Sequence, residues 1–386
     1  MSIARILIVA CATAPTALFA QDITYSLGTE VFGTFDGSDT NQKSEFQPRL
    51  SFGLNAEHRF ANGLEASLHV QALARIGGGG GDLYVPEATL DYTTGGYDLM
   101  VGTDIESWGV TEAAELTDIL NQVDLDRNLA GDTRLGQPTL RVSHLSDWGW
   151  VAAYYLPYTP ERPYAGVFGL DALPVTYETS QEEWEPGFAL RYAHNMGDYD
   201  FGGFVFHGLD RSPSVIAGAG GPELLYPITT QIGAYGQISL GSTFLRAEVL
   251  HNSDRVGFDG TIRAELGYTV EVEHEIYGLL DGQTDLALLA AYTGNSRDDS
   301  VQLLQDDFSL GAKLTWNTIA SPELTLLATM DAGNGTSFVT LGYERRINDA
   351  MTVELEAVTF FNVDDTDTLS PLDDAGYIRA AMTYRF

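Results

Sequence analysis

Hydrophobic and polar residues alternate with a period of two over long stretches of the chain. In 64–76, apolar residues hold every second position and mostly polar residues hold the others, and 49–57 repeats the pattern. Between these segments, Ala61-Asn62-Gly63 is a turn sequence typical of a β-hairpin. The same alternation recurs in 308–317 and 351–357. A period of two predicts strands with one apolar and one polar face.

Eighteen segments of this kind are candidates for strands. Many of them run for about ten residues, which is longer than the usual strand of a soluble sheet and fits a wall between lipid and water. The expected strands start near Ile23, Pro48, Leu64, Asp82, Tyr97, Pro138, Trp150, Pro186, Tyr199, Pro227, Thr243, Phe258, Thr284, Asp307, Leu324, Thr336, Met351 and Ala375.

The connections between these strands alternate in length, as in transmembrane β-barrels with short periplasmic turns and long outer loops. Short links include 61–63, 95–96, 147–149, 195–198, 241–242, 321–322 and 348–349. Longer links cover about 36–47, 77–81, 109–137, 160–185, 210–226, 295–306 and 363–374. Two links depart from the rule, because 332–335 is short for an outer loop and 271–283 is long for a turn. Sixteen strands therefore remains an alternative count.

The two ends of the chain fit export to an outer membrane. Residues 1–20 combine Arg5, an apolar stretch and small residues before Gln21, which predicts a cleaved signal peptide and leaves 21–386 as the barrel. The competing interpretation is a lipoprotein signal with lipid on Cys11, the only cysteine. The last strand ends on Phe386, which resembles the C-terminal signature by which outer-membrane barrels engage the barrel-assembly machinery.

Charge excludes one broad class of partner. The chain has 20 Lys and Arg residues against 54 Asp and Glu residues, a net charge of -34. Nucleic-acid binding needs a basic surface that displaces counterions, so nucleic acid is not an expected partner. Only Lys43 and Lys313 are lysines, and arginine holds its charge and forms bidentate contacts. The cations are therefore expected to serve in fixed positions.

The polar faces of the strands carry charges and must face the lumen, since a cation facing lipid at mid-membrane costs about 2–4 kcal/mol. One interpretation is a charged, water-filled pore, and the other is ion pairs that brace the wall. Most surplus acid lies in connections, where 36–41 and 364–374 could bind divalent cations but are better explained as solvated loops. The expected pore-lining residues are Arg49, Arg59, Glu65, His69, Arg75, Arg141, Arg191, Arg246, Glu248, Arg263, Lys313 and Arg379.

The connection 109–137 is unlike the others. A helix-cap pattern at 111–116 is followed by Leu116, Ile119, Leu120 and Val123, which form a short apolar helical face. These residues predict a short helical or loop segment that folds into the lumen and narrows it. The expected constriction residues are Trp108, Glu112, Asp118, Asn121, Gln122, Asp124 and Asp126. The alternative is that Trp108, Asp118 and Asn121 only anchor a long loop to the wall. The stretch at 124–128 starts like a calcium loop but has Leu129 where that loop needs glycine.

The strings Trp108–Glu112, Asp118–Gln122 and Leu135–Pro138, with Leu156-Pro157 and Arg162, resemble a group of bacterial outer-membrane porin-like proteins. That group is distantly similar to the alginate-export and phosphate-selective porin superfamily. The resemblance covers about 97–165 and implies a barrel with an inward-folded stretch after an early strand. This chain has Asn121-Gln122 where many relatives carry Asn-Pro. The resemblance implies architecture rather than a particular solute.

Enzymatic chemistry is not expected. His251-Asn252-Ser253 is the only tight Ser–His candidate for an outer-membrane phospholipase, and it lacks an evident third member. The histidines have no metal-binding spacing, and nothing fixes an Asp/His pair of the omptin-protease type. The glycine run 77–81 lacks the Lys-Ser/Thr of a phosphate loop. No metal or cofactor is predicted.

The sequence therefore predicts an all-β, transmembrane antiparallel β-barrel of sixteen to eighteen strands in the outer membrane. The expected function is passive diffusion of small hydrophilic or charged solutes, with outer-membrane lipid and lipopolysaccharide around the barrel. The alternative is a barrel that exports or anchors an acidic polysaccharide, or a non-conducting structural protein. Monomer and homo-oligomer both remain open.

Overall fold

A computed structural model describes residues 22–35, 46–77, 80–127, 133–164, 170–218, 220–257, 261–297, 304–364, 367 and 376–386. The predicted signal peptide, Cys11 and nearly all of the two acidic loops at 36–41 and 364–374 lie outside these residues.

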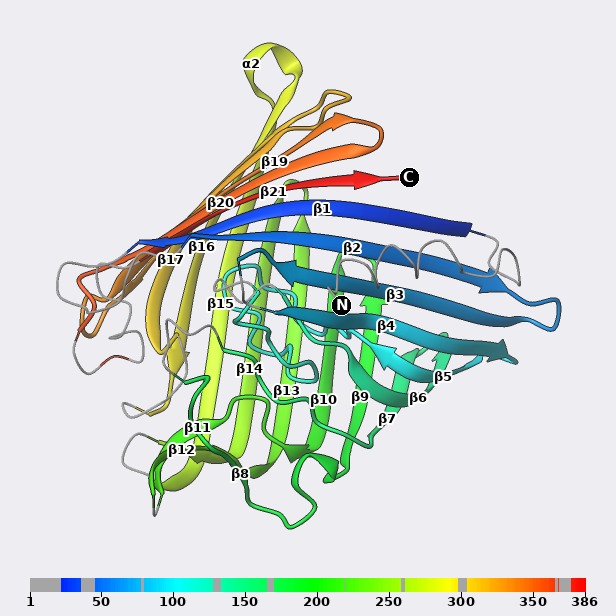
Figure 1. The fold of residues 1–386 in the computed structure, drawn as a ribbon, viewed down its shortest axis with the longest axis vertical. Coiled ribbons are helices and arrows are strands. Elements are labelled where there is room, and N and C mark those ends of the chain that lie inside the picture. Colours follow the sequence, from blue (N-terminus) through cyan, green and yellow to red (C-terminus); the bar gives the residue numbers. More distant parts are fainter. Residues whose placement is uncertain are drawn as a thin grey trace.

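Eighteen antiparallel strands form one closed barrel, in which each strand pairs with its neighbour and β21 pairs with β1 (Figure 1). The strands are β1 (Asp22–Phe35), β2 (Phe46–Arg59), β3 (Leu64–Arg75), β4 (Gly81–Thr94), β5 (Tyr97–Asp104), β6 (Gln137–Ser146), β7 (Gly149–Leu156), β9 (Gly187–Met196), β10 (Tyr199–Leu209), β13 (Ile228–Leu240), β14 (Thr243–Val256), β15 (Ile262–Gly278), β16 (Thr284–Asn295), β17 (Asp306–Trp316), β18 (Glu323–Asp331), β19 (Ser337–Asn348), β20 (Met351–Phe361) and β21 (Gly376–Arg385). Among the described residues, closure leaves no edge strand in the barrel itself, which is what a bilayer requires.

The larger strand count is confirmed, and most strands begin within two residues of the expected position. The strand expected near Phe258 begins at Ile262 instead. The link 271–283 is not a long turn, because β15 extends to Gly278 and only the four-residue helix α2 (Leu279–Gly282) follows. The outer link 332–336 is short, as the pattern indicated.

The connections alternate between the two barrel ends. The end that carries the C terminus has the short turns, such as 60–63, 95–96 and 241–242. The other end has the connections 105–136, 157–186 and 210–227. By the rule for transmembrane barrels, the end with the C terminus is the periplasmic end.

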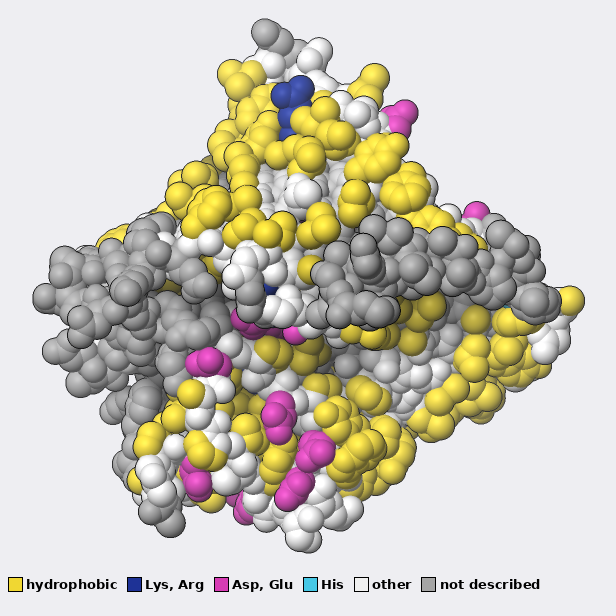
Figure 2. Space-filling model, in the orientation of Figure 1, with side chains coloured by type: hydrophobic (Ala, Val, Ile, Leu, Met, Phe, Trp, Pro, Cys, Tyr) yellow, Lys and Arg dark blue, Asp and Glu magenta, His cyan; other side chains and the backbone are white. Residues whose placement is uncertain are grey.

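Side chains alternate across the wall. On β15, Leu266, Tyr268 and Val270 are exposed on the outside, whereas Glu265 and Thr269, which alternate with them, are buried toward the lumen. Figure 2 shows hydrophobic side chains spread over the barrel wall, with acidic side chains gathered in the lower part of the view. The outer surface is therefore apolar and the lumen polar, as a lipid-facing wall demands.

The outer connections contain structure that the sequence did not reveal. The stretches 160–185 and 210–226, expected to be loops, contribute β8 (Val175–Tyr177), β11 (Ser214–Gly218) and β12 (Gly221–Tyr226) to a separate three-stranded sheet, with the 3-10 helix η2 (Glu182–Trp184) nearby. None of these strands has the length or alternation of a wall strand, so period alone could not identify them. Among the described residues, no helix is long and apolar enough to cross a membrane.

Candidate functional site: a segment folded across the lumen

The connection between β5 and β6, described for 105–127 and 133–136, lies inside the barrel, where Figure 1 shows it in cyan. Trp108, Ile119 and Leu120 are each at most 8% exposed and pack in one apolar cluster. Their partners are wall side chains of β7, β9, β10, β13 and β14, namely Ala152, Tyr154, Leu156, Ala189, Phe204, Phe206, Tyr235 and Leu250. We call 105–136 the inward segment. Burial of its apolar side chains against the wall stabilises its position in the lumen.

The expected helix does not form. Residues 112–114 and 116–117 are turns, and Glu115 has a φ of 40° in the left-handed region. The physical reason is that the backbone N–H groups of this stretch donate to carboxylates on the wall rather than to carbonyls of a preceding helical turn. The segment lies in the lumen, and of the two predicted conformations, helix and loop, the structure has the loop.

Glu248 on β14 is the main attachment of the inward segment to the wall. Its Oε1 accepts hydrogen bonds from the N–H of Val110 (2.6 Å) and from the N–H and hydroxyl of Thr111 (2.8 and 2.9 Å). Its Oε2 accepts from the N–H and hydroxyl of Thr117 (2.8 and 2.9 Å). The residue is 2% exposed. One buried carboxylate is thus satisfied by five donors, which compensates the cost of its desolvation.

Glu271 on β15 makes a second attachment beside the first. Its Oε2 accepts from the N–H groups of Glu112 and Ala113, both at 3.0 Å, and its Oε1 pairs with Arg246 at 2.7 Å. The Glu112 side chain is exposed, and no described cation pairs with it. Glu112 therefore presents a free carboxylate to the lumen.

The segment is also attached to the opposite wall. Arg49 on β2 donates to the carbonyls of Asp126 (3.3 Å) and Arg127 (3.4 Å), and Arg75 on β3 pairs with the Asp126 carboxylate. Tyr84 on β4 donates to the Arg134 carbonyl. In the order of the barrel, β2–β3 and β14–β15 lie on opposite sides. The inward segment thus crosses the lumen from one wall to the other.

Polar side chains within the segment fix its own backbone. Asp118 accepts from the N–H groups of Trp108 and Gly109. Asn121 accepts from the N–H of Glu106 at 2.8 Å and donates to two carbonyls. Burial raises the pKa of the Asp124 carboxyl, which the N–H groups of the next turn partly offset. The predicted constriction residues therefore lie together, and most of them hold the segment in shape.

Arg211 was missed by the sequence reasoning. It follows β10, is 5% exposed, and donates to the Leu120 carbonyl (2.9 Å), the Thr159 hydroxyl (2.9 Å) and the Gln137 amide oxygen (3.1 Å). Burial lowers the pKa of its guanidinium to about 10, so it stays charged at neutral pH. It joins the inward segment, β6 and two outer connections. Because Arg211 lies in a connection outside the wall strands, the alternation of the sequence could not indicate that it joins these elements.

Arg162 adds to the same junction. Its Nε donates to the Gln122 amide oxygen at 3.0 Å and its Nη2 to the Arg211 carbonyl at 2.6 Å. The Gln122 amide in turn donates to the Pro160 carbonyl at 3.3 Å. Gln122 is therefore held between the inward segment and the next outer connection.

Most predicted pore-lining cations are paired with carboxylates. Arg141 is the extreme case, with carboxylates of β4, β5 and the inward segment within 4 Å, namely Asp91, Asp98, Asp104 and Glu106. The other pairs are Arg49–Glu30, Arg59–Glu65, Arg75–Asp82, Arg75–Asp126, Arg246–Glu271, Arg246–Glu273, Lys313–Glu323, Arg379–Glu30 and Arg379–Glu354. Bracing of the wall therefore accounts for most of the lumen arginines.

The remaining predicted residues differ in setting. Arg191 lies under the inward segment, donates to the Tyr235 hydroxyl at 2.8 Å and stacks on Trp108 at 5.4 Å. His69 on β3 is half-buried and lies directly opposite Glu87 of β4 in the register of the wall. Arg263 is near the outer end of β15 and is exposed. Arg49, 4% exposed, and Glu248 hold the segment rather than face an aqueous path.

Phe386, the residue predicted from the sequence to act in assembly, lies at the end of the C-terminal strand β21. Phe386 is 61% exposed on the outer face, and its ring stacks on those of Tyr25 and Tyr384, each at 5.7 Å. Its N–H and carbonyl pair with Tyr25 on β1 at 2.9 Å, next to the seam that closes the barrel. The terminal aromatic thus occupies the periplasmic rim of the seam.

We expect Phe386→Ser to reduce the yield of folded barrel in the outer membrane several-fold, because the seam loses its aromatic anchor and the residue predicted to act as the assembly signal. The measurement is the ratio of the compact to the heat-denatured band in unheated gel samples of membrane fractions. Phe308→Ser is the matched control, since Phe308 is 51% exposed on the outer face of β17, away from the seam. Equal yields for the two variants would contradict a special role for Phe386.

No protein-family model matches the chain, and no curated protein matches it. Solved structures similar in fold include OccK8 (OprE) of Pseudomonas aeruginosa, with 11% identity, coverage of 96% of this chain and 99% of that chain, and a TM-score of 0.57. OccAB3 of Acinetobacter baumannii has 7% identity, coverage of 95% and 99%, and a TM-score of 0.56. OprB of Pseudomonas putida has 11% identity, coverage of 95% and 94%, and a TM-score of 0.50.

At these identities the likeness concerns the fold alone. None of the three structures bears an alginate-export or phosphate-selective name, so that finer resemblance stays a prediction. The coarser prediction is confirmed: the chain has the porin-like β-barrel fold with transmembrane-type strands.

Proposed function

We propose that this protein is an outer-membrane channel for passive diffusion of small hydrophilic solutes and has no catalytic activity. The observation that carries the proposal is the inward segment, attached to opposite walls by Glu248 and Arg49 and packed against β7–β14. Such a segment narrows the lumen but leaves part of its cross-section open to solutes. The closed 18-stranded barrel, with an apolar outer surface and a polar lumen, supports the same function.

The path we propose runs beside β16–β21. The attachments of the inward segment described above reach β2–β4, β13–β15 and the apolar cluster of β7–β14. The lumen on the remaining side is lined by polar and charged side chains, including Lys313, Glu344 and Arg379. Solutes would therefore pass between the segment and this wall.

We further propose that the channel prefers cations. The lumen arginines are compensated by carboxylates, and Arg141 alone has four of them nearby. Free carboxylates such as Glu112 then set the sign of the local potential, which enriches cations in a narrow passage. This outcome reverses what a count of lumen arginines suggests.

Planar-bilayer recordings of the purified barrel in a KCl gradient test both proposals. We expect discrete conductance steps and a reversal potential of the sign that indicates K⁺ over Cl⁻. Glu112→Gln should lower the K⁺/Cl⁻ permeability ratio by about twofold, because one uncompensated charge is removed from the narrow part. Glu182→Gln is the matched control, since Glu182 lies in η2 outside the barrel wall.

Each result of these recordings bears on a different proposal. Absence of conductance steps would contradict the channel. A reversal potential of the opposite sign would contradict cation preference and leave the channel intact. An equal effect of the two variants would place the selectivity at the outer mouth rather than beside the inward segment.

A further inference from the structure

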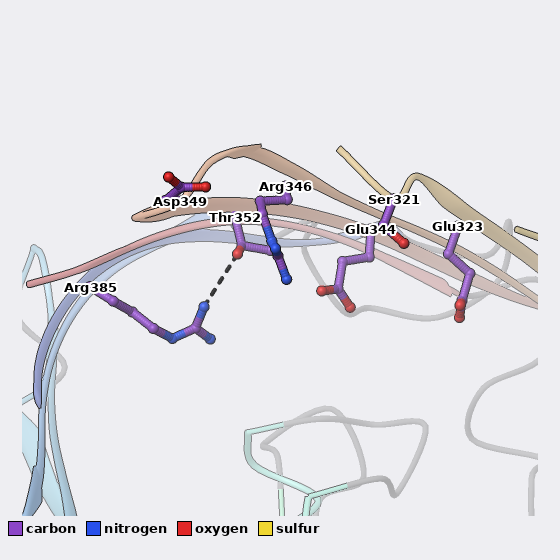
Figure 3. A pocket seen from close by; sticks show the side chains of 7 residues that line it. All are labelled: Ser321, Glu323, Glu344, Arg346, Asp349, Thr352 and Arg385. Atoms are coloured by element: carbon purple, nitrogen blue, oxygen red, sulfur yellow. Dashed lines mark hydrogen bonds between the residues drawn. The ribbon is translucent and has the colours of Figure 1, made fainter. Parts of the chain in front are cut away.

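A cavity of about 400 Å³ opens into the lumen at the periplasmic end, formed by β18–β21 and their turns (Figure 3). Every residue that lines it is polar or charged: Ser321, Glu323, Glu344, Arg346, Asp349, Thr352 and Arg385. A volume of this order suits a small ligand, and the polar lining disfavours a hydrophobic ligand. We call this space the rim cavity.

Two guanidinium groups in the rim cavity lack carboxylate partners. Arg346 on β19 and Arg385 on β21 form no ion pair with a described residue, in contrast to Arg75, Arg141 and Arg379 on the same inner surface. Arg385 donates to the Thr352 hydroxyl at 3.3 Å, the bond drawn in Figure 3. The other N–H groups of both guanidinium groups remain available to a ligand.

The backbone fixes both arginines. The N–H of Arg346 donates to the Ala320 carbonyl at 3.0 Å, in the turn between β17 and β18. The N–H of Arg385 donates to the Ala350 carbonyl at 2.7 Å, in the turn between β19 and β20. These bonds tie the two donors to neighbouring turns, so that their separation is set by the rim of the barrel.

Glu344 supplies the opposite charge. In the register of the wall it lies directly between Glu323 on β18 and Glu354 on β20. Glu323 pairs with Lys313 at 3.1 Å and Glu354 with Arg379 at 3.1 Å, whereas no described cation pairs with Glu344. Like charges directly opposite one another are unfavourable, so this row gains from a bound cation.

Glu344 and Arg346 are on the same face of one strand, two residues apart. That spacing places their backbones about 6.6 Å apart. No direct ion pair forms between them. A molecule between them can donate to the carboxylate and accept from the guanidinium at the same time.

We propose that the rim cavity binds small zwitterions, molecules that carry both a carboxylate and an ammonium group, of the size of a free amino acid. Arg346 and Arg385 hold the carboxylate, and arginine is suited to this by its planar, bidentate geometry. Glu344 holds the ammonium group, and the Ser321 hydroxyl supplies a further polar contact at the rim. The proposal rests on the channel function above, since the cavity then lies at the periplasmic exit of the path.

The test measures the equilibrium binding of L-glutamine to the purified, folded full-length barrel in detergent. Saturation-transfer NMR reports the bound fraction of L-glutamine. We expect L-glutamine to bind about tenfold more tightly than acetate or methylammonium, because each of these satisfies only one half of the cavity. Arg346→Gln and Glu344→Gln should each weaken L-glutamine binding by about tenfold.

Arg345→Gln is the matched control. It removes the same charge from the same strand, one residue away, on the outer face of the wall. Binding of acetate as tight as that of L-glutamine would overturn the zwitterion site in favour of a plain anion site. An equal effect of Arg345→Gln and Arg346→Gln would also overturn it. Binding of L-glutamine does not depend on conduction. A barrel that conducts but does not bind L-glutamine would therefore refute only the proposed binding site. A barrel that binds L-glutamine but does not conduct would refute only the proposed channel.

Discussion

Replacing Glu248 with alanine is expected to raise the single-channel conductance and to make the open current noisy. The carboxylate accepts five hydrogen bonds from Val110, Thr111 and Thr117, and each bond to a charged group is worth about 1.5–3 kcal/mol. Without it, three backbone N–H groups lose their acceptor at a buried site. The segment would then leave the β14 wall and the passage would widen.

Planar-bilayer recording checks this expectation, with the folded state of each variant verified by the compact band in unheated gel samples. Glu275→Ala is the matched control, because it makes the same substitution at a β15 carboxylate whose hydrogen bond is to Tyr277 and not to the inward segment. Conductance of the Glu248 variant equal to that of the parent barrel, in a folded protein, would refute the attachment as the determinant of pore size.

Replacing Arg211 with methionine is expected to cause the largest loss of stability. The side chain is buried, and its guanidinium joins Leu120, Thr159 and Gln137 from three different parts of the chain. Loss of the guanidinium leaves these three buried acceptors without their donor, and each such acceptor costs about 1–3 kcal/mol. Methionine keeps most of the volume, so the loss reports the hydrogen bonds rather than a cavity.

The measurement is the temperature at which the compact band of the purified barrel converts to the unfolded band. Arg59→Met is the control, because the Arg59–Glu65 pair is exposed at 68% and 48% and such surface pairs contribute about 0–1 kcal/mol. A transition temperature of the Arg211 variant no lower than that of the control would show that the junction is not needed for stability.

The wall of the barrel was predictable because the position of each side chain, toward lipid or toward the lumen, depends on neighbouring residues in the sequence. A strand between lipid and water must alternate, so the faces of segments such as 64–76 and 308–317 follow from their residues alone. The inward position of 109–137 was also predictable, since Leu116, Ile119 and Leu120 are apolar in an otherwise polar connection and need a partner.

The conformation of the inward segment was not predictable in the same way. The cap pattern at 111–116 favours a helix in isolation, yet Glu248 and Glu271, more than 130 positions away in the chain, take the N–H groups that would begin it. Local propensity is a weak preference of less than about 1 kcal/mol per residue, and several charge-assisted bonds exceed it. The sheet of β8, β11 and β12 escaped prediction because its strands are short.

The sequence by itself determined the fold class, a count of sixteen to eighteen strands and the two faces of the wall strands that alternate clearly, because alternation and length encode them locally. The tertiary structure decided which carboxylate meets which arginine, and that pairing assigns most lumen cations to bracing. It also decided that Arg211 is a central junction and that Arg346, Arg385 and Glu344 share one cavity. Such pairings join residues far apart in the chain, and only closure of the barrel brings them within bonding distance.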